Sequence, residues 1–334
     1  MNFTRNKRAL INWFLSPQVT GLDMSKYDIG KLSGLISNQF NQIPVKKNNN
    51  NFKNQLFVPK LDLSKLENDN YKSILKTIES KIISCEGDYI KHFLLHGSLA
   101  SNDYVDDWSD LDTWVVLNDS KLKLVKDLEF LFYFFKDLNN HIFEIDPLAH
   151  HGFITLLESD LYNYGNDIMP IEVLREAKSF IGDDNIGYDM KDTSKLEIKR
   201  LLHIKKLFLN FNSKGIFESH AKNDRYLTID MINNNIGMYQ LKYIISLIAS
   251  IPSLYLSSIN KPVYKRDSFK NFTAEFGKFK ILEKVTYIRD NFHKYNYSFN
   301  SDNKIPYEII TTLGDNWISE SIVLLNKITC NFYE

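Results

Sequence analysis

The chain has 334 residues, of which 43% are hydrophobic and 13% aromatic, a composition typical of a folded protein with about two domains. Its 41 basic and 41 acidic residues give zero formal net charge, which disfavours a protein that coats nucleic acid through bulk positive charge. The two cysteines, Cys85 and Cys330, have neither metal-ligand spacing nor the number needed for a disulfide framework, which favours a cytoplasmic location.

The first 56 residues predict an N-terminal arm. Residues 4 to 15 have the pattern of a short helix, and no cleavage site of the signal-peptide kind follows them. Residues 37 to 56 are rich in asparagine and too polar to bury much apolar surface, so a loop is expected there. No run in the chain approaches the roughly 18 apolar residues that span a bilayer, so no membrane contact is expected.

Residues 57 to 165 predict a compact α/β domain. Apolar residues recur at steps of three and four from Tyr71 to Ile83, which indicates an amphipathic helix. Residues that favour β-structure then predict strands at 92 to 96 and 110 to 117. A polar stretch that starts with glycine and serine separates these two strands.

The rest of this domain is expected to contain a helix at about residues 121 to 138 and a third strand. The third strand is IFEID, residues 142 to 146, which Pro147 would end. Residues 153 to 158 are a candidate for one more strand. The expected fold class is α/β (α+β), with a small mixed sheet.

Residues 166 to 334 predict an all-α domain, because the pattern beyond about residue 165 is helical. Ser194 and Glu197 form a capping-box signature at the start of one helix. Further helices are expected over residues 225 to 258, 266 to 292 and 305 to 331.

The segment HGSLASNDYVDDWSDLDTWVV contains the strongest candidate for a functional site. Gly97, directly after a strand, lets the backbone turn sharply, and amide groups together with the Ser98 hydroxyl can donate hydrogen bonds to phosphate. Asp110 and Asp112 are two apart on the predicted strand, so both carboxylates leave one face while Leu111 points into the core. Neighbouring carboxylates that bind Mg²⁺ or Mn²⁺ with substrate phosphates are typical of phosphoryl or nucleotidyl transfer.

A third carboxylate is expected to complete the metal site or to deprotonate the attacking hydroxyl. Asp146 is favoured because the end of a strand reaches the open edge of the sheet, and Glu144, on the same face, is the alternative. His150 and His151 are of the type that binds metals or phosphates, but exposed turn histidines are the preferred interpretation.

Residues 93 to 146 resemble the core of the DNA polymerase β-type nucleotidyltransferase superfamily. Its signature is a hydrophobic residue, Gly, Gly or Ser, a short gap, then Asp, a hydrophobic residue and Asp or Glu. The resemblance implies roles for the matching residues here: Gly97 and Ser98 in binding the triphosphate, and Asp110, Asp112 and Asp146 in binding two metal ions and in catalysis. Two positions depart from the pattern, since His96 precedes the glycine and Thr113 follows the second aspartate.

The layout of a small mixed sheet followed by a helical domain also resembles the subgroup that transfers AMP to antibiotics. In such enzymes the helical half often supplies basic residues to the phosphates. Lys265, at the start of a predicted helix, is the candidate for nucleotide binding here, because a helix start and a basic side chain both favour an anion.

These features predict a two-metal enzyme that moves a nucleoside monophosphate from an NTP, with ATP expected, to an acceptor hydroxyl and releases pyrophosphate. The neutral charge favours a small-molecule acceptor over a tRNA end or a protein, and the oligomeric state stays open. The alternative is a non-catalytic nucleotide-binding or interaction module on the same fold.

Overall fold

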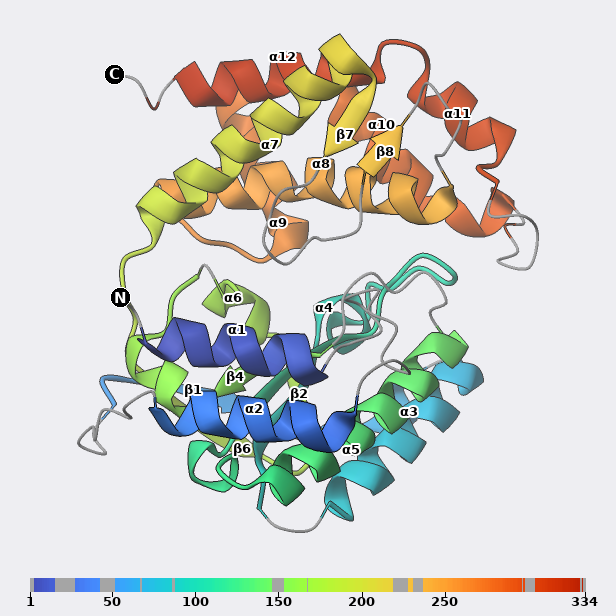
Figure 1. Ribbon diagram of the computed structural model, residues 1–334. Coiled ribbons are helices and arrows are strands. Elements are labelled where there is room, and N and C mark those ends of the chain that lie inside the picture. Colours follow the sequence, from blue (N-terminus) through green and yellow to red (C-terminus); the bar gives the residue numbers. More distant parts are fainter. Residues whose placement is uncertain are drawn as a thin grey trace. The chain divides into compact units, whose positions relative to one another are not determined.

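The chain folds into two compact units of helices and small sheets, seen in the computed structural model in Figure 1. This architecture confirms the expected α+β class. The first unit comprises Met1–Tyr104, Ser109–Tyr164 and Leu174–Lys191, and the second comprises Val105–Trp108, Gly165–Val173 and Asp192–Glu334. The structure describes residues 3–15, 28–42, 52–66, 68–85, 88–145, 153–166, 168–218, 228–230, 237–295, 297, 304–330 and 332.

A four-stranded mixed sheet lies at the centre of the first unit, with the strand order β4-β3-β2-β5. β2 (Ile90–His96) and β3 (Asp112–Leu117) are antiparallel and correspond to the two strands predicted on either side of the glycine turn. β4 (Ile154–Leu157) pairs in parallel with β3 and confirms the further strand expected there. β5 (Lys178–Ser179) pairs antiparallel with β2 at the opposite edge.

The two faces of this sheet meet different surroundings. On one face, Leu95 and Val115 belong to a core that is shared with helices α1 (Phe3–Leu15), α2 (Ile29–Gln42), α3 (Asp69–Ile83) and α5 (Val125–Ile145). Side chains alternate along a strand, so His96, Asp112 and Trp114 share the other face. The candidate site therefore belongs to the face opposite the helical layer.

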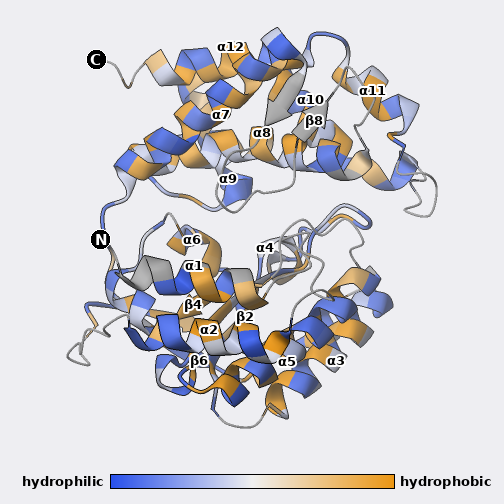
Figure 2. Cartoon of the chain, viewed as in Figure 1, coloured by the Kyte–Doolittle hydropathy of each residue, from blue (hydrophilic) through white to orange (hydrophobic). Residues whose placement is uncertain are grey.

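Helix α3 shows why the predicted amphipathic helix forms. The Asn68 side chain caps its start and accepts hydrogen bonds from the backbone N–H groups of Asn70 and Tyr71 at 2.9 and 3.3 Å. The buried residues follow at steps of three and four: Tyr71, Leu75, Ile78 and Ile82. Figure 2 shows the resulting mixture of hydrophobic and hydrophilic positions around α3 and α5.

Helix α1 belongs to the first unit and lies within the residues for which an N-terminal arm was predicted. Helix α1 buries Ile11 and Phe14 in the main core, and the Asn12 side chain binds the free edge of β4. Its Nδ2 donates to the carbonyl oxygen of Thr155 at 2.8 Å, and its Oδ1 accepts from the Thr155 N–H at 3.1 Å. One amide side chain thus satisfies both backbone groups that an edge strand leaves open.

Replacing Asn12 with alanine is expected to lower the free energy of unfolding by about 1–3 kcal/mol, because the buried Thr155 backbone loses both partners. Urea denaturation measures this change. Asn41→Ala is the control, since its exposed Nδ2 makes a 3.3 Å contact with the Lys123 carbonyl, and its loss should have a smaller effect. Equal effects of the two replacements would contradict the role assigned to Asn12.

A buried ion pair also joins α1 to the 3₁₀ helix η4 (Glu158–Asn163), which follows β4. The Asp160 carboxylate lies 3.6 Å from the Arg8 guanidinium and accepts a hydrogen bond from the Leu157 N–H at 2.9 Å. Burial nevertheless raises the pKa of Asp160 to about 6, against the lowering effect of Arg8.

This raised pKa predicts a loss of stability as pH rises from about 4 to about 6. The folded state binds the Asp160 proton more tightly than the unfolded state, whose ordinary pKa is 3.8, so ionisation in this window favours unfolding. Asp160→Asn keeps an acceptor for the Leu157 N–H and removes the titration, so stability should fall less between pH 4.5 and pH 7 than in the wild type. Urea denaturation midpoints at both pH values test this prediction, and Asp107→Asn, at an exposed position, is the control. The prediction would be refuted if stability changed with pH by the same amount in the wild type and in Asp160→Asn.

The prediction of a third strand at residues 142 to 146 is wrong, because α5 continues to Ile145. The helix persists because its buried residues keep the spacing of a helical face through Leu131, Phe135, Leu138 and Ile142. The prediction that no further strands follow residue 165 is also wrong. In addition to β5, β6 (Asp184–Tyr188) pairs antiparallel with β1 (Asn54–Val58).

The second unit is mainly helical, as expected, with a small antiparallel pair of strands, β7 (Ile216–Glu218) and β8 (Thr228–Asp230). Its helices are α7 (Ser194–Lys214), α8 (Met238–Ser258), α9 (Lys265–Phe276), α10 (Lys280–Asp290), α11 (Tyr307–Leu313) and α12 (Trp317–Cys330). A single helix was predicted for residues 266 to 292, but Gly277, at φ +80°, ends α9. Phe208 and Phe211 of α7 pack against Trp317.

Two features of this unit differ from the sequence-based expectations. Thr193 is the N-cap of α7 and makes no side-chain capping bond, while Glu197 is buried in an ion pair with Arg200 at 3.3 Å, so the expected capping box does not form. The segment Gln240–Ser258 of α8 is long and apolar enough to cross a membrane by length and composition, contrary to expectation. About two thirds of its most apolar window is buried within the protein, as in the core helices of many proteins, so this is weak evidence for a membrane span.

Candidate active site

The ends of β2 and β3 bring Gly97 and Asp112 into direct contact. In the sheet His96 is paired with Asp112, so the residue that follows β2 turns over the Asp112 carboxylate. Gly97 has φ +71°, and a Cβ atom built on it would lie 2.2 Å from Asp112 Oδ2 and 3.0 Å from Asp112 Cγ. The turn therefore needs glycine for two reasons, its left-handed backbone and the space that the carboxylate occupies.

Ser98 follows in the short helix α4 (Gly97–Ser101), which replaces the simple turn expected there. Its carbonyl oxygen accepts from the backbone N–H of Asn102, whose left-handed conformation ends the helix, and from that of Asp103 at 3.0 Å. The Ser101 hydroxyl donates to the Gly97 carbonyl at 3.0 Å and also contacts the Asp103 carboxylate. These bonds fix the backbone of the turn that was predicted to bind a triphosphate.

Asp110 lies two residues before β3, outside the strand, whereas Asp112 is its first residue. Leu111, between them, is buried in the main core, as predicted, and both aspartates are half-buried. Leu111 therefore separates two carboxylates that are both kept partly accessible at the start of β3. Because both carboxylates are half-buried, water competes less for a ligand of these groups than at an exposed site, and neither charge is enclosed.

The two residues that depart from the expected glycine-serine and paired-aspartate signature are both buried. His96 occupies the hydrophobic position before Gly97 and is 2% exposed, and Thr113 is 1% exposed. Thr113 is paired with Leu95 and faces the helical layer, where no described residue forms a hydrogen bond with its hydroxyl. Both side chains are thus buried in the sheet, as an apolar residue would be.

The loop between α4 and β3 is held by packing as well as by hydrogen bonds. Its residues Val105–Trp108 belong to the second unit, and there the buried Trp108 packs edge-on against Phe292 with ring centroids 5.0 Å apart. The Lys242 ammonium group lies 5.8 Å from the centre of the same ring. Asp106 and Asp107 of this loop are exposed, as expected for solvated acids.

The third carboxylate does not come from a strand at residues 142 to 145. Glu144 is on the last turn of α5, exposed, and 3.4 Å from His141 Nδ1. Asp146, the favoured candidate, lies outside the described residues, as do His150 and His151. In the part of the chain that the structure describes, no group of three or more His, Cys, Asp or Glu side chains is placed to hold a metal ion.

Lys265 is the first residue of α9, in the second unit, and its carbonyl oxygen accepts from the Ser268 hydroxyl at 2.6 Å. The neighbouring Arg266 guanidinium lies over the Tyr264 ring, 5.4 Å from its centre. A role for Lys265 in nucleotide binding remains a prediction.

The geometry at Gly97 and Asp112 combines the two elements that a phosphate-transfer site needs. Backbone amide groups and a serine hydroxyl can donate to phosphate oxygens, and two carboxylates that are two residues apart in the chain have the chemistry of ligands for Mg²⁺ or Mn²⁺. Asp112 is in contact with the turn itself. Comparisons with protein-family models, curated proteins and solved structures gave no match for this chain.

Proposed function

We propose that this chain is a metal-dependent nucleotidyltransferase that moves a nucleoside monophosphate from an NTP to an acceptor hydroxyl. The observation that carries the proposal is the contact between the Gly97 backbone and the Asp112 carboxylate. A phosphate bound by the amide groups of this turn would lie beside a cation bound by Asp112, which is the arrangement that the transfer requires. The resemblance of residues 93 to 146 to the polymerase β-type superfamily supports the same reaction.

In this reaction the acceptor oxygen forms a bond to the α-phosphorus of the NTP. The bond from that phosphorus to the bridging oxygen breaks, and pyrophosphate leaves with the electron pair, while the hydroxyl proton passes to a carboxylate or to water. Gly97 and Ser98 would orient the triphosphate, and Asp110 and Asp112 would hold Mg²⁺ or Mn²⁺, which would neutralise phosphate charge. Catalysis would rest on positioning and electrostatics.

The remaining parts of the proposal come from the sequence. Asp146 is proposed as the third carboxylate, for the metal site or as the base, and Lys265 as a contact to the triphosphate. A small-molecule acceptor is favoured by the zero net charge, with ATP as donor and the cytoplasm as location.

A second candidate function is a nucleotide-binding module without catalysis. The observation that favours it is the sequence of β4, ITLL, which is the strand after β3 and has no acidic residue. In the superfamily the third carboxylate comes from a following strand. If no other residue supplies it, binding of NTP and metal would persist while transfer would not.

Pyrophosphate release from each of the four NTPs, with Mg²⁺ or Mn²⁺, tests the proposal. Pooled small-molecule hydroxyl compounds and tRNA serve as acceptors, and Asp110→Ala is compared with the wild type. We expect release that depends on an acceptor and is lost in Asp110→Ala. Stabilisation by NTP with metal, but no release in any pool, would support the binding module.

A further inference from the structure

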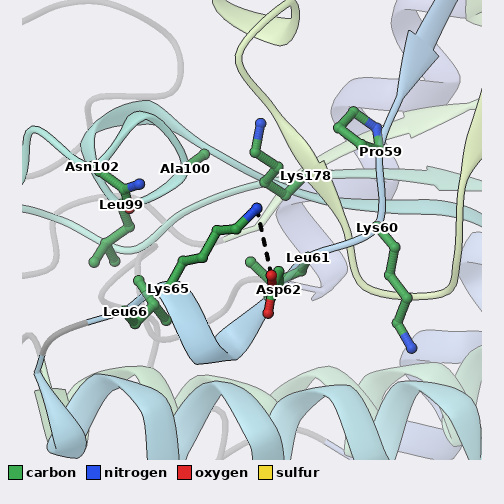
Figure 3. A pocket seen from close by; sticks show the side chains of 10 residues that line it. All are labelled: Pro59, Lys60, Leu61, Asp62, Lys65, Leu66, Leu99, Ala100, Asn102 and Lys178. Carbon is green, nitrogen blue, oxygen red and sulfur yellow. Dashed lines mark ion pairs between the residues drawn. The ribbon is translucent and has the colours of Figure 1, made fainter.

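A cavity of about 170 Å³ lies in the first unit directly beside α4, the helix that begins with Gly97 and Ser98. Its apolar wall is made by Leu61, Leu66 and Leu99. Charged and polar residues of three separate segments also line it: Lys60, Asp62 and Lys65 of the first, Asn102 of the second and Lys178 of the third. Figure 3 shows Lys65 and Lys178 in the middle of the view, whereas Lys60 extends away from them.

Backbone hydrogen bonds hold the segments that form this cavity. β5, which carries Lys178, pairs with β2 on one side, where Lys178 is opposite Leu95. On its other side, the Ser179 N–H donates to the Pro59 carbonyl at 2.9 Å, and the Ser179 carbonyl accepts from the Leu61 N–H at 2.8 Å. The cavity is therefore formed before any ligand binds, which lowers the entropic cost of binding.

Among the described charged residues around the cavity, one lysine has no counter-ion. Lys65 is paired with Asp62 at 3.5 Å, and Lys60 is paired with Glu79 at 3.4 Å. For Lys178, by contrast, no described carboxylate lies within ion-pair distance of the ammonium group. Lys178 is half-buried, so an anion bound there would be screened less by solvent than on an open surface.

We propose that this cavity is a binding site for a small organic anion, a carboxylate or phosphate monoester with a compact apolar body. The apolar body would pack against Leu61, Leu66 and Leu99, and the anionic group would pair with Lys178 and reach Asn102. The size suits this class, because a cavity of roughly 150 Å³ holds a benzene ring. An inorganic phosphate alone would leave the apolar wall uncovered, and a neutral ring would leave Lys178 unpaired.

The proposal is tested with phenyl phosphate and benzoate as probes, titrated calorimetrically into the full-length protein without metal or nucleotide. We expect both anions to bind more tightly than phenol and inorganic phosphate, and methyl NMR signals of Leu61, Leu66 and Leu99 to shift. Lys178→Gln keeps most of the side chain and removes the charge, so it should weaken phenyl phosphate binding about tenfold. The matched control is Lys60→Gln, which should leave the affinity unchanged.

Asn102→Gly provides a second variant, because glycine keeps the left-handed backbone and removes the amide group. It should weaken the binding of phenyl phosphate. The proposal would be overturned if neither anion binds, or if inorganic phosphate or phenol binds as tightly as phenyl phosphate. It would also be overturned if Lys178→Gln leaves the affinity unchanged. Since the titration contains neither NTP nor metal, its outcome is independent of nucleotidyl transfer, and Asp112→Asn should bind the probes like the wild type.

Discussion

Replacement of Asp112 with asparagine is expected to abolish nucleotidyl transfer, with a fall in turnover on the order of 10²–10³-fold or more. Asparagine has nearly the same shape, so it fits the space beside Gly97, where a Cβ would lie 2.2 Å from Oδ2. The change removes one negative charge from a site proposed to bind a divalent cation, and a neutral amide is a much weaker ligand for such an ion. Acceptor-dependent pyrophosphate release measures the effect.

The matched control is Asp107→Asn, which makes the same chemical change in the loop before β3. Asp107 is exposed and has φ +62°, a conformation that asparagine also adopts readily. It should keep wild-type turnover. Circular dichroism and urea midpoints should agree for wild type and both variants. Turnover of Asp112→Asn within a few-fold of the wild type would remove Asp112 from the metal site and with it the main support for the proposed function.

The central part of the site could be predicted from sequence because its signals are local. A run of residues that favour β-structure, a glycine and a second run with paired aspartates predict two strands and a turn without knowledge of the rest of the chain. The structure places Gly97 against Asp112 and Leu111 in the core. Alternation along a strand is a short-range rule, and it held here.

The features that were missed depend on contacts between distant parts of the chain. Residues 142 to 145 have the composition of a strand, but they continue a helical face that begins near Leu128, and packing of that face decides the outcome. The N-terminal helix is fixed by a hydrogen bond from Asn12 to Thr155, 143 residues away. No periodic pattern in either segment indicates such a partner.

The cavity beside α4 was missed for a related reason. Its half-buried cation, Lys178, is on a strand of two residues, too short for any periodic signal, and that strand forms only because β2 and the segment near Pro59 bind it on both sides. A lysine in such a position cannot be distinguished by sequence from a solvated one. The cavity wall is likewise formed by segments that are far apart in the chain.

Gly97→Ala is expected to lower both activity and stability, because alanine cannot occupy this turn without moving the Asp112 carboxylate. A left-handed backbone costs an alanine roughly 1 kcal/mol, and the new methyl group would also lie 2.2 Å from Oδ2. We expect a total loss of about 2–4 kcal/mol in the free energy of unfolding. Displacing the carboxylate by about 1 Å should reduce turnover on the order of 10²-fold.

Gly277→Ala separates the two causes, since Gly277 has φ +80° but a methyl group added there would meet no described atom within 4 Å. With ψ −174°, Gly277 should lose only a backbone contribution, about 1–3 kcal/mol, and keep full activity. A double-mutant cycle provides the stricter test. In an Asp112→Ala background the carboxylate is gone, so Gly97→Ala should cost little more stability than Gly277→Ala. If Gly97→Ala lowers the free energy of unfolding by the same amount in that background as in the wild type, a clash with Asp112 is not the reason for glycine at this position. The contact that supports the proposed site would then have no energetic support.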